Sequence, residues 1–170
     1  MKLFSQTLID ELTARAAASP RLRANHNVHT SPTELVQRYF VAAQRDSYFR
    51  PHRHSTRSEL ALVIRGHFDV LTFNDSGQVT GRYGVGAETA NIGFETPRDT
   101  WHTLVATTEG ATFLEIKEGP YDAATSVEFA AWAPPEGHAS VSAFLSWLRQ
   151  AQPGSVAPGP SLSGADTPSR

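Results

Sequence analysis

Short apolar runs separated by turn residues fill the middle of the chain. The runs cover residues 60–64, 68–73, 79–85, 90–94, 102–106 and 112–117. Glycine, proline, asparagine and aspartate lie between them, at intervals typical of antiparallel strands in a sandwich or barrel. We therefore expect an all-β protein with peripheral helices, and a single small jelly-roll barrel is the simplest architecture that closes such a set of strands.

Two flanking segments have helical periodicity instead. Residues 5–18 and 140–151 each repeat apolar positions with the spacing of an amphipathic helix, which predicts one N-terminal and one C-terminal helix. The apolar positions are Leu8, Ile9 and Leu12 in the first segment and Val141, Phe144, Leu145 and Leu148 in the second. Residues 34–43 form an apolar run that fits either a helical turn or a short strand, so the pattern leaves this segment open.

Length and composition define the expected domain. A chain of 170 residues is usually one domain with a hydrophobic core. Residues 153–170 are rich in proline, glycine, serine and alanine, with almost nothing apolar to bury, which predicts a disordered tail. We expect residues 1–152 to form a single domain that includes both helices.

Charge and cysteine content restrict the partners. The formal net charge is -2, so no global field favours nucleic acid or an anionic membrane. No apolar run approaches a membrane span, and Asp10 and Glu11 interrupt the segment where a signal peptide would be apolar, so we expect a cytoplasmic protein. The chain has no cysteine, and any metal ion must therefore be held by nitrogen and oxygen.

Candidate metal ligands lie beside one of the predicted strands. Side chains alternate between faces in an extended chain, so His52 and His54 project to the same side. Glu59 follows at the start of the next apolar run, and two imidazoles and a carboxylate can converge there. A fourth candidate, His102, begins a later predicted strand, and whether it meets the others depends on the fold.

The spacing of these residues resembles the two sequence motifs of the cupin superfamily. The matching positions are His52, His54, Glu59 and Gly66 for the first motif, and Pro97 and His102 for the second. The resemblance implies a small jelly-roll barrel in which His52, His54, Glu59 and His102 bind one divalent metal ion. The sequence departs from the second motif at three positions, where Asn91, Asp99 and Ala106 replace the usual Gly, Gly and Asn.

Further segments resemble the WbuC-type cupin-fold metalloproteins, which occur among bacterial polysaccharide biosynthesis proteins. The resemblance rests on eight segments taken in order, among them Asn25-x-Asn27-x-His29, Arg50-Pro-His-Arg-His54, Trp101-His-Thr103 and Glu115-Ile-Lys-Glu-Gly-Pro-Tyr121. It describes a fold and a metal site and implies no defined reaction. Three histidines and one carboxylate suit Fe, Mn, Ni, Co or Zn, and leave room for a small-molecule ligand that carries an anionic or chelating oxygen.

Strand alternation adds candidates for substrate binding and catalysis. Arg50 and Tyr48 share a face with His52, and Arg50 can pair with a phosphate or carboxylate of the ligand. Glu115 and Lys117 share a face of the last strand, and that face points either into the barrel or to water.

A second set of substrate-binding candidates precedes the predicted barrel strands. Asn25, Asn27 and His29 fall on alternate positions, which fits either a pocket-lining segment or a solvated edge strand. If the segment lines a pocket, Asn25, Asn27 and His29 are candidate substrate ligands, and position along the chain does not decide between the two cases.

Three functions fit this sequence. The first is a metal-dependent isomerase or epimerase of a sugar or sugar nucleotide, in which Glu115 or Lys117 moves a proton. The second is an iron-dependent oxygenase of a small molecule, and the third is a non-catalytic ligand-binding module. The polysaccharide association favours the first function, and the superfamily resemblance allows a homodimer.

Overall fold

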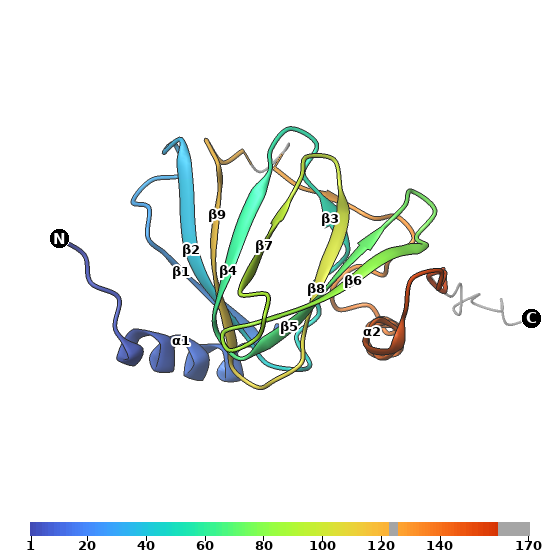
Figure 1. Cartoon of the computed structure of the whole chain (residues 1–170), viewed down its shortest axis with the longest axis horizontal. Coiled ribbons are helices and arrows are strands. Elements are labelled where there is room, and N and C mark those ends of the chain that lie inside the picture. The colour runs from blue at the N-terminus through green and yellow to red at the C-terminus, as the bar shows by residue number, and fades with distance from the viewer. Residues whose placement is uncertain (123–125, 160–170) are drawn as a thin grey trace, which may run out of the picture.

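Two five-stranded antiparallel sheets face each other and form a barrel (Figure 1). The computed structural model describes residues 1–122 and 126–159. Sheet A has the order β1 (Arg23–Asn27), β2 (Val36–Ala43), β9 (Ala111–Glu118), β4 (Glu59–Arg65) and β7 (Gly93–Thr96). Sheet B has the order β10 (Glu128–Phe129), β3 (His52–Arg53), β8 (Trp101–Ala106), β5 (His67–Phe73) and β6 (Val79–Gly86). The expected all-β architecture with peripheral helices is confirmed.

The segment that the sequence left open is strand β2. It pairs with the edge strand β1 on one side and with β9 on the other, so it lies inside sheet A. Its outward side chains Phe40 and Ala42 are buried under a helix, while Tyr39 and Val41 point into the barrel. Apolar residues on both faces of the strand explain why its sequence lacks a clear alternation.

Both predicted helices are present and cover different sheets (Figure 1). Helix α1 (Gln6–Ala18) begins at Ser5, whose hydroxyl accepts a hydrogen bond from the Leu8 amide, and it packs on the outer face of sheet A. Helix α2 (Val141–Gln150) buries Phe144, Leu145 and Leu148 against side chains of sheet B. No helix among the described residues is long and apolar enough to cross a membrane.

Part of the segment that was predicted to be a disordered tail is ordered. Residues 153–157 lie against the start of β6, where the Gly154 amide donates to the Val79 carbonyl and the Ser155 carbonyl accepts from the Val79 amide, both at 2.8 Å. Val156 also forms a bridge to Gln78. Backbone hydrogen bonds to a strand do not depend on side-chain polarity, so composition alone gave a wrong prediction for residues 153–157. Residues 160–170 of the predicted tail lie outside the described residues.

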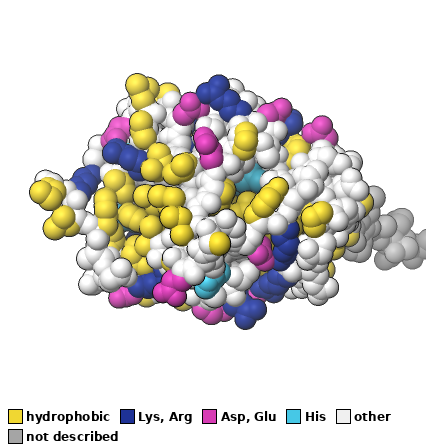
Figure 2. All heavy atoms as spheres, in the orientation of Figure 1, with side chains coloured by type: hydrophobic (Ala, Val, Ile, Leu, Met, Phe, Trp, Pro, Cys, Tyr) yellow, Lys and Arg dark blue, Asp and Glu magenta, His cyan; other side chains and the backbone are white. Residues whose placement is uncertain are grey.

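The outer face of sheet A is partly apolar. Helix α1 packs on β1 and β2, whereas the outward residues of β4 remain partly exposed. These residues are Leu60, Leu62 and Ile64, and hydrophobic side chains gather over this sheet in Figure 2. The opposite side chains of β4 alternate inward and are buried, which places Glu59 and Ala61 in the interior.

Candidate metal centre

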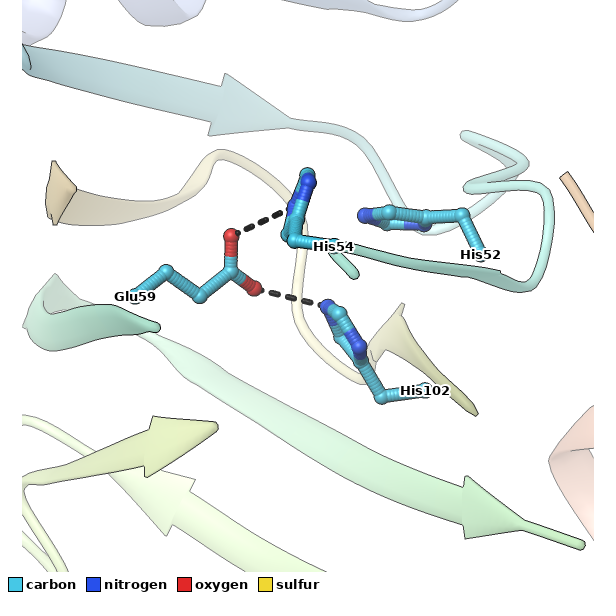
Figure 3. A group of neighbouring side chains, drawn as sticks. All are labelled: His52, His54, Glu59 and His102. Carbon is cyan, nitrogen blue, oxygen red and sulfur yellow. Dashed lines mark ion pairs between the residues drawn. The ribbon is translucent and has the colours of Figure 1, made fainter. Parts of the chain in front are cut away.

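Four predicted ligands come together between the two sheets (Figure 3). His52 of β3 lies directly opposite His102 of β8 in sheet B, and His54 is the first residue after β3. Glu59 is the first residue of β4 in sheet A. One ligand atom from each of the four residues lies within 4.8 Å of the others, so the group could hold a single ion that links the two sheets.

The Glu59 carboxylate lies against two of the imidazole rings. Its Oε1 is 2.7 Å from His102 Nε2 and its Oε2 is 3.0 Å from His54 Nε2 (Figure 3). All three side chains are buried, and His102 has no exposed surface. An ionised carboxylate in such a place needs a compensating positive charge, because burial without one is costly.

The backbone fixes the orientation of each ring. The Nδ1 atom of His52 lies 2.9 Å from the Arg50 carbonyl, that of His102 lies 2.8 Å from the Thr100 carbonyl, and that of His54 contacts the Ser126 carbonyl. A carbonyl can only accept, so each Nδ1 carries the hydrogen and each neutral ring presents its Nε2 lone pair to the centre. This is the tautomer that binds a metal ion through Nε2.

The Nε2 atoms have no alternative partner. Within residues 1–122 and 126–159, no hydrogen-bond partner satisfies His54 Nε2 or His102 Nε2, despite their short distances to Glu59. With neutral rings, two lone pairs and a carboxylate face one another, and this arrangement is repulsive unless a proton or a metal ion lies among them. The donor set and its unpartnered buried nitrogens fit a divalent metal ion.

The pKa values follow the same geometry. Burial and, next, the neighbouring His102 lower the pKa of His52 to about 3, so this ring is neutral near pH 7. Burial alone would raise the pKa of Glu59, but His102 and His54 hold it well below its usual range. Burial lowers the pKa of His102, while Glu59, the Thr100 carbonyl and Glu115 raise it, and the net shift is upward. The centre thus retains a carboxylate that attracts a cation.

Glu115 and Lys117 point into the barrel beside this centre. Lys117 Nζ lies 2.6 Å from Glu115 Oε1 and 3.9 Å from Glu59 Oε2, and only small parts of both side chains are exposed. Burial first, and the Glu59 charge second, raise the pKa of Glu115. Of the two orientations that the sequence allowed, the structure has the inward one.

Tyr39 completes this group and was not predicted. Its hydroxyl donates to Glu115 Oε1, and its ring lies 5.2 Å from the Lys117 ammonium. The contact follows from the register of β2 on β9, in which Tyr39 pairs with Glu115. A single sequence does not contain that register, although strand alternation places Tyr39 and Val41 on one face.

Two cavities adjoin the centre. The metal-side cavity, of about 300 Å³, is lined by His52, His54, Glu59, Glu115, Lys117, Arg21, Arg23, Arg50, Phe49, Phe129, Glu136 and nine further residues. The amide cavity, of about 430 Å³, is lined by Asn25, Asn27, His29, Thr30, Ser31, Pro32, Gln37, Tyr39, Lys117 and Tyr121. They are contiguous, because Asn25, Tyr39, Lys117 and Tyr121 line both.

Most of the predicted substrate-binding residues line one of these cavities. Arg50 lies in the metal-side cavity, where its guanidinium donates to the Ala130 carbonyl at 2.9 Å and lies over the Phe129 ring. Asn25 and Asn27 belong to the edge strand β1, and with His29 they line the amide cavity. The two interpretations of this segment are therefore compatible, since an edge strand can present one face to a cavity.

Tyr48 lies elsewhere, and its predicted position was wrong. Its ring packs on Phe144 of α2, and its hydroxyl donates to the Pro134 carbonyl at 3.0 Å. Tyr48 does not line the metal-side or the amide cavity. The chain between Tyr48 and His52 is not a regular strand, so simple alternation does not apply there.

Known proteins support the fold assignment. Residues 4–85 match a family model described as a domain of unknown function (DUF6016). No curated protein matches the chain in sequence. The capsular polysaccharide assembling protein CapF from Staphylococcus aureus is similar in structure, with a TM-score of 0.54, 14% identity, and coverage of 65% of this chain and 32% of CapF.

A point mutant of the oxalate decarboxylase OxdC from Bacillus subtilis is also similar, with a TM-score of 0.50 and 20% identity. The match covers 65% of this chain and 28% of OxdC, so the chain corresponds to about a third or less of each of these two proteins. At such identities the likeness establishes the fold and leaves the WbuC subtype a prediction. Together with the His52, His54, Glu59 and His102 cluster, these similarities show that the chain is a cupin-fold protein.

Proposed function

We propose that this protein is a metal-dependent enzyme that isomerises or epimerises a sugar or sugar nucleotide. One observation carries the proposal: the paired Glu115 and Lys117 lie beside a four-residue group that can hold a metal ion, inside a cavity that a small molecule can enter. The cupin fold alone gives no reaction, since CapF and OxdC share the fold and are described by different activities.

His52, His54, Glu59 and His102 would hold the ion. A bound divalent ion would supply Lewis-acid polarisation of a carbonyl or hydroxyl oxygen of the substrate. The protein contributes the fixed orientation of the rings through their backbone hydrogen bonds, which resist rotation when a ligand binds. Three of the four residues, His52, His54 and Glu59, line the metal-side cavity, so a substrate there could reach the ion.

Glu115 and Lys117 would move the proton. Lys117 Nζ lies 2.6 Å from Glu115 Oε1, so a proton can pass between the two side chains. The raised pKa of Glu115 brings this acid closer to the pH at which it can both accept and release a proton. Tyr39 holds the Glu115 carboxylate in place by donating its hydroxyl hydrogen. Arg50, which also lines the metal-side cavity, would bind an anionic group of the substrate.

Hydrogen exchange with solvent tests this function. The protein is loaded anaerobically with Mn, Fe, Co, Ni or Zn and incubated in D₂O with sugar acids, sugar phosphates and nucleotide sugars. We expect one metal form to incorporate deuterium at a substrate carbon without oxygen. Lys117→Met should abolish exchange, whereas Lys2→Met, at the other lysine of the chain, should not.

Two results would contradict the proposal. Turnover that requires oxygen and gives no exchange would indicate an oxygenase. Metal-dependent ligand binding without turnover of any substrate would indicate a binding module. The polysaccharide setting rests on the WbuC resemblance, and a nucleotide sugar as the exchanging substrate would support it.

A further inference from the structure

The inner face of sheet A carries a continuous row of polar side chains from the metal centre to the edge strand. Glu59 pairs with Lys117, and Lys117 pairs with Gln37. In the next row, Glu115 pairs with Tyr39, and Tyr39 pairs with Asn27 of β1. The two cavities lie along these rows, so a ligand that enters at the metal centre can extend toward β1.

The amide cavity has the polar groups that a neutral hydroxylated ligand needs. Among the described residues of its lining, Lys117 is the one lysine or arginine and none is a carboxylate, and Lys117 is already paired with Glu115. Asn25 Nδ2 donates to Asn27 Oδ1 at 2.9 Å, which leaves Asn25 Oδ1 to accept and Asn27 Nδ2 to donate. The rings of Tyr39 and Tyr121 provide flat apolar surface beside these groups.

The metal-side cavity, in contrast, is lined by many charged side chains. Arg21 and Arg23 share one carboxylate, Glu136, so this group of three carries a net positive charge. Arg50 adds a further positive charge, and no described residue accepts a hydrogen bond from its buried Nε. Lys117, Glu59 and Glu115 also line this cavity, so four cationic and three anionic side chains among its described lining residues leave it net positive, and a bound divalent ion would add to that charge. This end therefore favours an anionic oxygen group, which the amide cavity would not neutralise.

The distance between the two ends exceeds one sugar ring. Asn27 on β1 and Ala61 on β4 lie three strands apart in sheet A, through Tyr39 and Glu115. Three strand spacings amount to about 14 Å. Lys117 and Tyr39 line both cavities, so a single ring held at the metal centre would touch the near side of the amide cavity and leave its far side, at Asn27 and His29, unfilled.

We propose that the ligand is an acidic glycoside of at least two rings. Its anionic ring lies at the metal centre and Arg50, and its neutral ring lies in the amide cavity, hydrogen-bonded by Asn25 and Asn27. This inference rests on the proposed function and specifies its substrate class. It assigns Asn25 and Asn27 to specificity, since they would select for ligand length without contact to the reacting atoms.

Calorimetric titration of the full chain loaded with Zn(II) tests the inference. The probes are cellobiuronate, which joins glucuronate to neutral glucose, and glucuronate, glucose 6-phosphate and cellobiose. We expect cellobiuronate to bind about tenfold tighter than glucuronate, because the second ring adds two hydrogen bonds or more. The two acidic single rings show whether the centre prefers a carboxylate or a phosphate, and cellobiose should bind weakest.

Variants locate the second ring. Asn25→Ala/Asn27→Ala, at two exposed positions of an edge strand, should lower cellobiuronate affinity to the level of glucuronate. Asn91→Ala, in a loop outside both cavities, is the matched control and should retain the tenfold difference. Thermal unfolding of each variant confirms that it is folded before titration.

The outcomes separate this inference from the proposed function. Metal-dependent binding of glucuronate with no gain for cellobiuronate would overturn the two-ring ligand and leave the metal-dependent function intact. A gain for cellobiuronate that persists in the double variant would overturn the assignment of Asn25 and Asn27. Failure of every acidic probe to bind the Zn(II)-loaded chain would count against both proposals.

Discussion

The two ends of the barrel interior differ sharply, although the same strands build both. Strand β9 presents Glu115 and Lys117 at one end and Phe113 at the other, all on its inner face. Strand β4 likewise changes from Glu59 to Val63. The polar end contains the candidate metal centre. The apolar end is a packed cluster of hydrophobic side chains that includes Val63, Phe68, Leu104 and Phe113, and we call this cluster the floor of the barrel.

The difference shows how charged groups are placed precisely inside a small protein. Phe113 packs edge-to-face on Phe68 with ring centroids 5.3 Å apart, and such packing fixes the strands of both sheets relative to each other. The charged side chains project from the same strands and are stabilised by partners: Lys117 by Glu115, and Glu59 by the imidazole rings. The floor therefore determines the stability and the polar end determines the chemistry.

The largest expected loss of stability follows a cavity in the floor. Phe113 is 3% exposed, and Phe113→Ala should lower the free energy of unfolding by about 3–5 kcal/mol. The metal content of the folded fraction should stay unchanged. Chemical denaturation and metal analysis of the same sample measure both quantities.

Phe129→Ala provides the matched control at the rim. Phe129 is 47% exposed, so the same deletion should cost less than about 1 kcal/mol. Equal losses for the two variants would contradict the division between floor and polar end.

An intermediate effect is expected within the polar end. Glu115→Gln keeps the shape of the side chain and an acceptor for Tyr39, but it removes the charge that pairs with Lys117. The free energy of unfolding should fall by about 1–3 kcal/mol. Deuterium exchange should fall by about 10²-fold or more, because proton transfer would lose its acid.

Metal content is the control in the Glu115→Gln variant. Glu115 is not one of the four converging ligands, so the stoichiometry should equal that of the wild type. If the variant loses both the metal ion and deuterium exchange, Glu115 acts through the metal centre rather than on the substrate.

The smallest effect is expected at the cavity rim. Partial burial raises the pKa of Glu136. The hydrogen bond from Arg21 and the charge of Arg23 lower it, and the net result is a pKa below the usual value for glutamate. A lowered folded-state pKa stabilises the fold above the unfolded pKa of about 4.3 and loses that contribution as pH falls through the folded value. Because the carboxylate is partly exposed, Glu136→Gln should cost less than about 1 kcal/mol at pH 7.

Denaturation at two pH values checks the Glu136 prediction. The difference in unfolding free energy between wild type and Glu136→Gln should be measurable at pH 7 and should shrink below the folded-state pKa. A difference that is constant with pH would show that the Glu136 charge does not stabilise the folded state.

The four residues of the candidate metal centre could be predicted from the sequence, because their positions follow from strand alternation and from the spacing of the turns. Alternation in the extended chain from β3 into the next residue places His52 and His54 together, and the turn pattern predicted the barrel that brings His102 to them. The departure from the second motif at Asp99 is also tolerated, since Asp99 has φ +60° where glycine is usual, and aspartate accepts this conformation better than most residues.

The remaining site residues depend on contacts that a single sequence does not contain. The inward orientation of Glu115 and Lys117 contradicts the usual exposure of charged residues, and it is stable here because each has an ion partner. Tyr39 was missed because its role follows from strand register, and Tyr48 was misplaced because the chain leaves the regular strand before His52. The docking of residues 153–157 uses backbone hydrogen bonds, which composition does not report.

Metal analysis of the purified chain tests the central claim most directly. After reconstitution with a single divalent metal and removal of excess, the wild type should retain about one ion per chain, because the potential ligand atoms of His52, His54, Glu59 and His102 converge on one point. The His52→Ala/His102→Ala variant should retain well under one ion while remaining folded. A wild type with well under one ion per chain, or a double variant that binds as much metal as the wild type, would contradict the account.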